Sequence, residues 1–188
     1  MMIAVYILIG AVVLFALWYI VTGNNLIARR NRMEQCRSSI CVLLRQRNDM
    51  LPNLVAAAKA YMGHENQTLT RITELRAKAT EAASEQQQIE AGNAVSSLLP
   101  KLQLAVENYP ELKADKQFVS LHYSIEEMEQ QLQAIRRTYN AAVTDYNNGI
   151  QMFPSSWVAA RKGFALGELI EIPEAEKQNV NVGELFKE

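Results

Sequence analysis

An uninterrupted apolar stretch at the N-terminus limits what this chain can fold into more than any other feature of its sequence. No charged residue precedes Arg29, and residues 2–21 are almost wholly apolar. A helix needs about 20 such residues to cross a hydrocarbon core about 30 Å thick. We therefore predict a transmembrane anchor over residues 1–24, with Trp18 and Tyr19 at the interface that aromatic rings favour. A cleaved signal peptide would need a basic start and a small-residue cleavage site, and neither is clear.

The charges that follow the apolar stretch predict its orientation. Arg29, Arg30 and Arg32 come soon after it, residues 29–62 carry a net charge of +5, and residues 168–188 carry a net charge of −4. Basic residues that flank a span stay on the cytoplasmic side, so we expect the C-terminal bulk of the chain in the cytoplasm. The same arginines are suited to contact anionic head groups of the lipid bilayer.

Beyond the anchor, the sequence predicts an all-α fold. Only eight glycines and five prolines interrupt the 188 residues, too few for the tight turns of an all-β fold. Apolar residues recur at steps of three and four, the pattern of helices that pack lengthwise in an antiparallel, coiled-coil-like bundle. The first series contains Met33, Cys36, Ile40, Leu43, Arg47, Leu51, Leu54, Ala58 and Tyr61. The second contains Phe118, Leu121, Ile125, Met128, Leu132, Ile135, Tyr139, Val143, Tyr146, Ile150 and Phe153.

We assign this bundle to residues 25–167 and an acidic tail to residues 168–188. Arg47 is the one charged member of its series, so it should pair with a residue on a facing helix. Because Pro52 has no N–H to bond one turn back, it must kink its helix or start a new one. A polar segment that ends in Gly92 and Asn93 predicts a helix end and the tip of a hairpin.

The remaining prolines divide the second half of the chain. We expect a short helix from Leu98 that stops before Pro110, and then a long helix that Pro154 terminates. Ser155 or Ser156 is suited to cap a last helix, which Ile172 and Pro173 would end.

That last helix carries both aromatic and basic side chains. Trp157 and Phe164 lie near Arg161 and Lys162. This combination fits an amphipathic helix in a membrane interface. It also fits an element that covers the end of the bundle, and we favour the cover.

A set of polar residues forms pairs at helical spacing. Asp49 and Asn53 are four apart, and Asn140 and Asn147 are one heptad apart, so each pair lies on one helix face. We hypothesise a buried or interfacial hydrogen-bonded layer that sets helix register, and a plain solvated face explains the pattern equally well. The candidate layer consists of Asp49, Asn53, Lys59, Arg136, Tyr139, Asn140 and Asn147.

Residues that carry catalysis or bind metals are scarce. The two histidines, His64 and His122, belong to no metal-binding spacing, and Cys36 and Cys41 are five apart on different helix faces. There is no glycine-rich phosphate loop, and the basic residues lie near the membrane end. We therefore expect no cofactor, no metal, no nucleic-acid partner and no enzymatic activity.

Two separated motifs resemble the LemA family of bacterial membrane proteins, over nearly the whole chain. The first motif contains Asp49, Leu51, Pro52, Asn53, Leu54, Val55, Lys59, Tyr61, His64 and Glu65. The second contains Glu107, Tyr109, Pro110, Leu112, Lys113, Ala114, Phe118, Glu129, Ile135, Arg136, Tyr139, Asn140, Val143, Tyr146, Asn147, Phe153 and Pro154. The resemblance implies an elongated up-and-down bundle behind one membrane anchor, with no established enzymatic activity.

These observations favour a structural protein of the bacterial cytoplasmic membrane. The leading hypothesis is a single-pass, non-catalytic scaffold that self-associates and organises or remodels the cell-envelope membrane. The alternative is a regulatory adapter that binds one membrane protein, such as a protease or a signalling protein. A third, much weaker hypothesis is an enzyme with an acid/base pair at His64 and Glu65.

Overall fold

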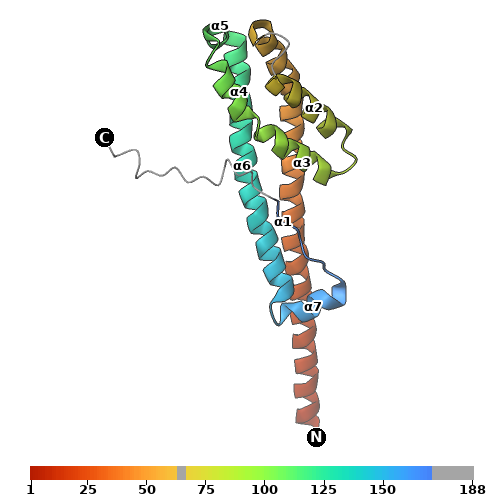
Figure 1. The fold of residues 1–188 in the computed structure, drawn as a ribbon. Helices are drawn as coiled ribbons and strands as arrows, with labels where there is room; N and C mark the ends of the chain where they lie inside the picture. Colours follow the sequence, from red (N-terminus) through yellow and green to blue (C-terminus); the bar gives the residue numbers. More distant parts are fainter. Residues whose placement is uncertain (63–66, 171–188) are drawn as a thin grey trace, which may run out of the picture. The chain divides into compact units, whose positions relative to one another are not determined.

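The structure is a computed structural model that describes residues 1–62 and 67–170 (Figure 1). Every regular element in these two ranges is an α-helix, in agreement with the predicted all-α class. The helices are α1 (Met2–Met62), α2 (Gln67–Glu81), α3 (Glu85–Ser96), α4 (Leu99–Val106), α5 (Pro110–Ala114), α6 (Lys116–Gln151) and α7 (Ser155–Lys162).

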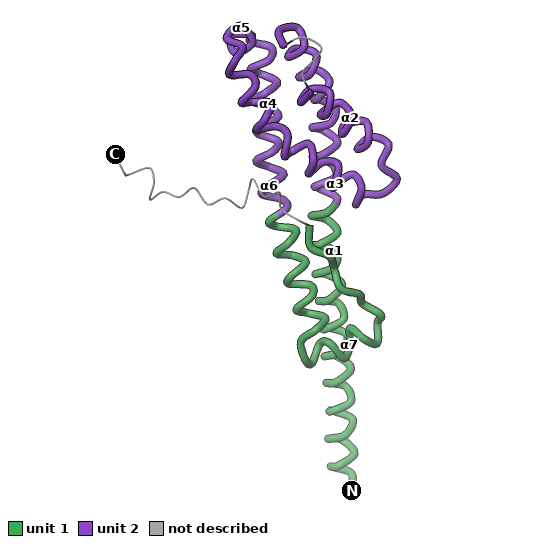
Figure 2. Tube along the Cα trace, in the orientation of Figure 1, with its two compact units in different colours: residues 1–37, 137–170 green, residues 38–136, 171–188 purple. Residues whose placement is uncertain are grey.

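The chain divides into two compact units, coloured separately in Figure 2. Unit 1 contains residues 1–37 and 137–170, and the described part of unit 2 lies within residues 38–136. Helices α1 and α6 contribute residues to both units. Since α1 continues from the apolar stretch to Met62, no break separates the predicted anchor from the first helix of the predicted bundle.

The core of unit 2 is built from the apolar series that the sequence identified. Leu51, Leu54 and Ala58 of α1 are buried with Leu69 and Ile72 of α2, and residues of α3, α4, α5 and α6 complete the cluster. Most members of both predicted series are buried, because a helix turn of 3.6 residues places every third or fourth side chain on one face. Tyr61 and Phe153, the last member of each series, are exposed instead.

Pro52 lies inside α1, so of the two predicted alternatives, a kink or a new helix, the start of a new helix is excluded. The missing proline N–H leaves the carbonyl of Asn48 without its usual helical donor. The Nε of Arg76, on α2, donates a hydrogen bond of 3.4 Å to that carbonyl. A partner from another helix therefore replaces the bond that Pro52 cannot make.

The predicted helix end at Gly92 and Asn93 is also wrong, because both residues lie within α3. The turn comes earlier, between Glu81 and Ser84, whose Oγ caps α3 by accepting a hydrogen bond of 3.2 Å from the Gln87 N–H. Gly92 serves a close contact instead of a helix end. A Cβ at this position would lie 2.5 Å from Cδ2 of Leu44.

Pro110 and Pro154 each follow a helix end, as predicted. Pro100 stands in the first turn of α4, and Tyr109, which is not helical, precedes a new short helix that begins at Pro110. Helix α6 ends at Gln151, shortly before Pro154.

The prediction for the last helix needs two corrections. Neither Ser155 nor Ser156 caps α7; Pro154 occupies the N-cap position without a side-chain bond. The helix ends at Lys162, because Gly163 adopts a left-handed φ of 69° that terminates it, and residues 164–170 continue without helix. Ile172 and Pro173, the predicted end, lie outside the described residues.

Within unit 1, the α1 and α6 segments lie side by side and run in opposite directions (Figure 2). Arg29 pairs with Asp145 at 2.7 Å, and Leu26 contacts the chain at Gly149. A Cβ on Gly149 would lie 3.1 Å from Cδ2 of Leu26, so the glycine allows a close approach of the two helices.

Candidate functional site

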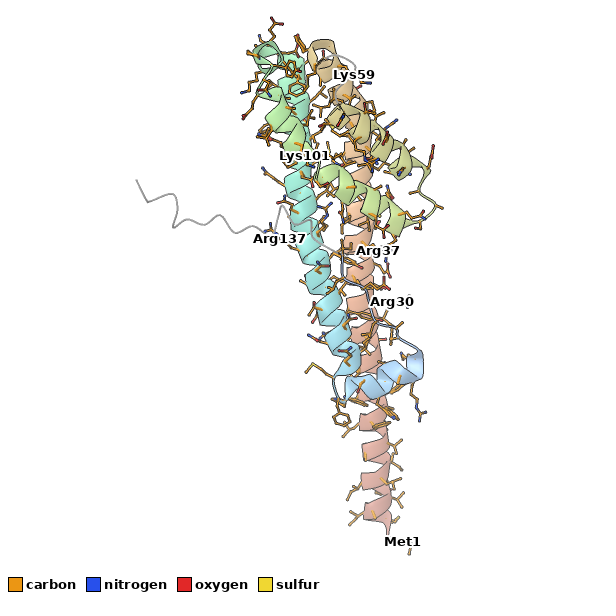
Figure 3. All side chains as sticks on the ribbon, viewed as in Figure 1. Met1, Arg30, Arg37, Lys59, Lys101 and Arg137 are labelled. Atoms are coloured by element: carbon orange, nitrogen blue, oxygen red, sulfur yellow. The ribbon has the colours of Figure 1, made fainter. Side chains whose placement is uncertain are left out.

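Most apolar side chains in the first part of α1 are exposed and lack a packing partner among the residues that the structure describes. Large hydrophobic residues from Met1 to Val21 are exposed, and Figure 3 shows the side chains near Met1 standing clear of other elements of unit 1. This helix is, among the described residues, the one that is long and apolar enough to span a membrane. Exposing so much apolar surface to water would be unfavourable, so a non-aqueous environment is the natural explanation.

Aromatic and basic side chains gather where this apolar stretch ends. The ring of Trp157, on α7, lies 5.8 Å from that of Phe15 and 6.1 Å from that of Tyr19. Trp18 stacks at an angle on Phe15, with ring centroids 5.6 Å apart. Of the predicted interface residues, Tyr19 therefore lies beside α7, and Trp18 lies beside Phe15, whose ring also contacts Trp157. We call Phe15, Trp18, Tyr19, Trp157, Arg161 and Lys162 the aromatic–basic cluster.

The three arginines predicted to set topology have different surroundings. Arg29 donates hydrogen bonds to the carboxylate and the carbonyl oxygen of Asp145, at 2.7 and 2.9 Å. Arg30 and Arg32 are exposed on α1, and Figure 3 labels Arg30. Arg30 and Arg32 therefore expose their positive charge to solvent, whereas Arg29 also ties α1 to α6.

Two asparagines of α6 bind the backbone of the segment that follows α7. Asn147 donates to the carbonyl of Gly167 at 3.0 Å and accepts from the Gly167 N–H at 2.8 Å. Asn140 makes the same pair of bonds with Ile170, at 2.9 and 3.0 Å. Each asparagine thus binds both the N–H and the carbonyl of one residue, through its side-chain Oδ1 and Nδ2 atoms.

Two tyrosines add a second row of bonds to the same segment. The Tyr139 hydroxyl donates to the carbonyl of Glu168 at 2.9 Å, and the Tyr146 hydroxyl donates to the carbonyl of Ala165 at 2.8 Å. We call Tyr139, Asn140, Tyr146 and Asn147 the Tyr–Asn ladder, and residues 164–170 the C-terminal segment.

The spacing of the ladder follows from helix and strand geometry. The two tyrosines lie seven residues apart on α6 and bind residues that lie three apart on the C-terminal segment. The same spacings hold for the two asparagines and the residues that they bind. Seven helical residues rise about 10.5 Å, and three extended residues cover about 10 Å, so the two chains stay in register. Because the bonds go to backbone atoms, the ladder fixes the path of the segment without requiring particular side chains there.

Both ladder tyrosines are almost fully buried, with 2% of each residue exposed. Burial raises the pKa of Tyr139 and of Tyr146 above the usual value of 10.0. The hydroxyls therefore stay protonated at neutral pH and can donate the hydrogen bonds that hold the C-terminal segment.

Unit 2 contains a buried ionic centre around Arg47. The Arg47 guanidinium donates to Glu129 at 2.5 Å, to Ser96 Oγ at 2.8 Å and to the Gly92 carbonyl at 2.8 Å. Arg136 also reaches Glu129, at 3.5 Å, and neither arginine is exposed to solvent. The prediction that Arg47 pairs with a facing helix is confirmed.

Electrostatics makes this centre sensitive to the charge of Glu129. Burial lowers the pKa of Arg47, and the nearby charge and hydrogen bond of Glu129 oppose this shift. Two buried guanidinium groups share Glu129, so its charge is needed to offset their desolvation.

A groove with a mixed polar and apolar lining opens beside this centre in unit 2. It has a volume of about 440 Å³, and its lining includes Ser96, His122, Glu126, Glu129, several glutamines and the apolar residues Leu99, Pro100 and Ile125. His122 contacts Glu126 at 3.3 Å and stacks on Phe118. No three His, Cys, Asp or Glu side chains among the described residues are grouped to hold a metal ion.

The seven residues of the predicted polar layer lie in different surroundings. Asp49 and Asn53 are exposed on α1, and Lys59 is half-buried beside an apolar pocket between α1 and α2. Arg136 belongs to the ionic centre of unit 2, whereas the other three members belong to the Tyr–Asn ladder of unit 1. The hypothesis that these residues set helix register stays a prediction.

Sequence reasoning missed three important partners. Tyr146 was predicted only as a packing residue of its helix, Glu129 was identified only as part of a motif, and Arg76 had no predicted role. Only Tyr146 carried a usable signal, since Tyr139 and Tyr146 repeat the seven-residue spacing of Asn140 and Asn147. His64, the basis of the weakest hypothesis, lies outside the described residues.

Over residues 1–62 and 67–170, the structure thus defines a helical protein with one candidate membrane span and with helices held together by polar as well as apolar contacts. The model of the LemA family matches residues 37–183. The chain belongs to the LemA family. Family membership and the exposed apolar start of α1 both indicate a membrane-associated protein.

Curated relatives agree with this assignment. Protein LemA of Metamycoplasma hominis is 26% identical over 173 residues, which cover 92% of this chain and 79% of that protein. The magnetosome proteins MamQ 1 and MamQ 2 of Paramagnetospirillum magneticum are each 23% identical over 204 residues, covering 95% of this chain and 75% of each relative. None of these three relatives is named as an enzyme.

Proposed function

We propose that this protein is a non-catalytic scaffold in the bacterial cytoplasmic membrane, anchored by a single span, with its remaining helices in the cytoplasm. The observation that carries the proposal is the exposed apolar part of α1, which runs without a break into helices that pack on one another. The exposed arginines after this stretch support the cytoplasmic orientation.

We further propose that the scaffold self-associates in coiled-coil-like fashion and thereby organises or remodels the envelope membrane. Unit 2 has apolar side chains that its own helices do not cover, among them Val119 and Tyr123, four residues apart on α6. Exposed apolar residues on one helix face are typical of surfaces that meet another chain. Two relatives named for a cellular structure, the magnetosome, fit an organising role better than a reaction.

The anchor is tested by membrane extraction. The full chain should stay with membranes in alkaline carbonate and dissolve in detergent, and deletion of residues 2–21 should release it. A control that replaces these residues with an equally long leucine–alanine segment should remain in the membrane, because length and apolarity decide insertion. Release of the full chain by carbonate would contradict the anchor.

Orientation is tested with one added cysteine. Cys36 and Cys41 are replaced by alanine, and the exposed Ser120 of α6 is replaced by cysteine. A membrane-impermeant maleimide should label this cysteine only after the cytoplasmic membrane is opened. Labelling of intact spheroplasts would reverse the proposed orientation.

Self-association is tested by cross-linking in native membranes. The wild type should give dimers or larger species, and Val119→Glu with Tyr123→Glu should reduce them. Gln131→Glu, which adds a charge at another exposed position of α6, is the matched control. Monomer alone from the wild type would remove the scaffold, and a stoichiometric foreign partner on co-purification would favour the adapter.

A further inference from the structure

Helix α7 and the turn before it expose large apolar side chains next to the apolar stretch of α1. Phe153 is 87% exposed, Met152 is 63% exposed and Trp157 is 43% exposed. The opposite side of α7 is occupied, because Val158 and Ala159 are buried. One side of α7 therefore packs on the rest of unit 1, and the other side exposes an aromatic side chain.

The place of α7 along α1 suggests what covers the open side. Trp157 packs against Phe15 and Tyr19, near the end of the apolar stretch of residues 2–21. The Lys162 side chain also reaches α1, since its Nζ would lie 2.5 Å from a Cβ placed on Gly23. If residues 2–21 cross the hydrocarbon core, α7 lies at the level where acyl chains meet head groups, which Trp and Tyr favour.

The charges of α7 fit that level. Arg161 and Lys162 form its last turn, and α7 contains no acidic residue. The Arg161 guanidinium lies 4.8 Å from the centre of the Trp157 ring, and the Lys162 Nζ lies 5.8 Å from that of Tyr19. Aromatic side chains with basic side chains close beside them are suited to the surface of a membrane that contains anionic lipids.

We propose that α7, together with Met152 and Phe153, is an interfacial membrane element that lies in the head-group layer of the bilayer spanned by α1. Phe153 and Trp157 insert among the upper acyl chains, and Arg161 and Lys162 bind anionic phospholipid head groups. This inference rests on the proposed anchor, because α7 reaches the bilayer only if α1 crosses it.

Tryptophan fluorescence in nanodiscs tests the depth of α7. The chain has two tryptophans, so Trp18→Phe leaves Trp157 as the reporter and Trp157→Phe leaves Trp18. The full chain is placed in phosphatidylcholine discs whose lipids carry bromine near the carbonyl end of the acyl chains. We expect both reporters to lose roughly half or more of their emission relative to unbrominated discs, as residues at the interface should.

The outcomes separate the two proposals. Quenching of Trp18 without quenching of Trp157 would overturn the role of α7 and leave the anchor intact. Absence of quenching at both positions would overturn the anchor itself. Phe153→Ser keeps Trp157 in place and should weaken its quenching, and unchanged quenching would contradict insertion of Phe153.

A second comparison tests the lipid charge. Adding phosphatidylglycerol to the discs should increase Trp157 quenching, and Arg161→Gln with Lys162→Gln should abolish that increase. Lys101→Gln with Arg137→Gln removes two exposed charges outside α7 and should preserve it. A response to phosphatidylglycerol that survives loss of Arg161 and Lys162 would overturn their assignment to head groups.

Discussion

Arg76 donates a hydrogen bond from its Nε to the carbonyl of Asn48, which is the carbonyl that Pro52 leaves without a helical donor. The bond joins α2 to α1 at the position where a proline would otherwise weaken a helix. At 3.4 Å it is long, so its contribution should be modest.

This relationship predicts a coupling between Arg76 and Pro52. Arg76→Met keeps the apolar stem and should cost about 0.5–1.5 kcal/mol of unfolding free energy, because the Asn48 carbonyl loses its donor. Pro52→Ala restores the helical N–H, so Arg76→Met should cost less in that background. Urea unfolding of the four proteins in a double-mutant cycle measures the difference, and a coupling of zero would contradict it.

The Tyr–Asn ladder predicts that Asn140 cannot be replaced by an apolar residue. Asn140→Leu removes both bonds to Ile170 and should lower the melting temperature and speed hydrogen exchange at the Ile170 amide. The exposed Asn148 on the same helix provides the control, Asn148→Leu, which should leave Ile170 protected. A raised melting temperature with unchanged assembly would count against any specifying role for Asn140.

Gly92 should resist substitution by alanine although it lies in a helix. Alanine would gain up to about 1 kcal/mol in helix propensity, but its Cβ would meet the buried Leu44 side chain at 2.5 Å. Overpacking of this kind costs about 1–3 kcal/mol, so we expect net destabilisation in thermal unfolding. Adding Leu44→Ala should make Gly92→Ala less harmful than it is alone, and an equal cost in both backgrounds would disprove the contact.

Glu129 should be the most sensitive polar residue of unit 2. Glu129→Gln removes the charge shared by Arg47 and Arg136 and should cost about 3–5 kcal/mol, the usual penalty for leaving a buried charge without its counter-charge. Glu126→Gln, at the neighbouring, more exposed position, is the matched control and should cost far less. Similar denaturant midpoints for the two variants would refute a structural role for the centre.

The tyrosines of the ladder predict an alkaline limit to stability. Their folded-state pKa values lie above 10.0, so the folded chain holds these protons more tightly than the unfolded chain does. Their contribution is therefore fully present below pH 10.0 and is lost as the pH rises through the folded-state pKa. Tyr139→Phe should flatten this decline when melting temperature is followed against pH, while Tyr6→Phe, in the exposed apolar stretch, should not.

The helical class, the apolar first stretch and most of the core were predictable from the order of the amino acids alone. These features depend only on spacing along the chain, because an apolar side chain at every third or fourth position of a helix is buried whichever neighbouring helix covers it. Thus Ile40, Leu54, Ile125 and Val143 were predicted from spacing alone, and all four are buried. Even the need of Arg47 for a partner followed from its place in an apolar series.

Which groups far apart in the sequence contact one another depends on how the helices pack in three dimensions. Glu129 is 82 residues from Arg47, and nothing local to either residue indicates the pairing. Gly92 carries the signature of a helix end, yet it accommodates Leu44 within a helix, because a missing side chain serves a turn and a close contact equally well. Polar bonds and close contacts depend on the exact approach of two segments in space, which a spacing pattern along one segment does not contain.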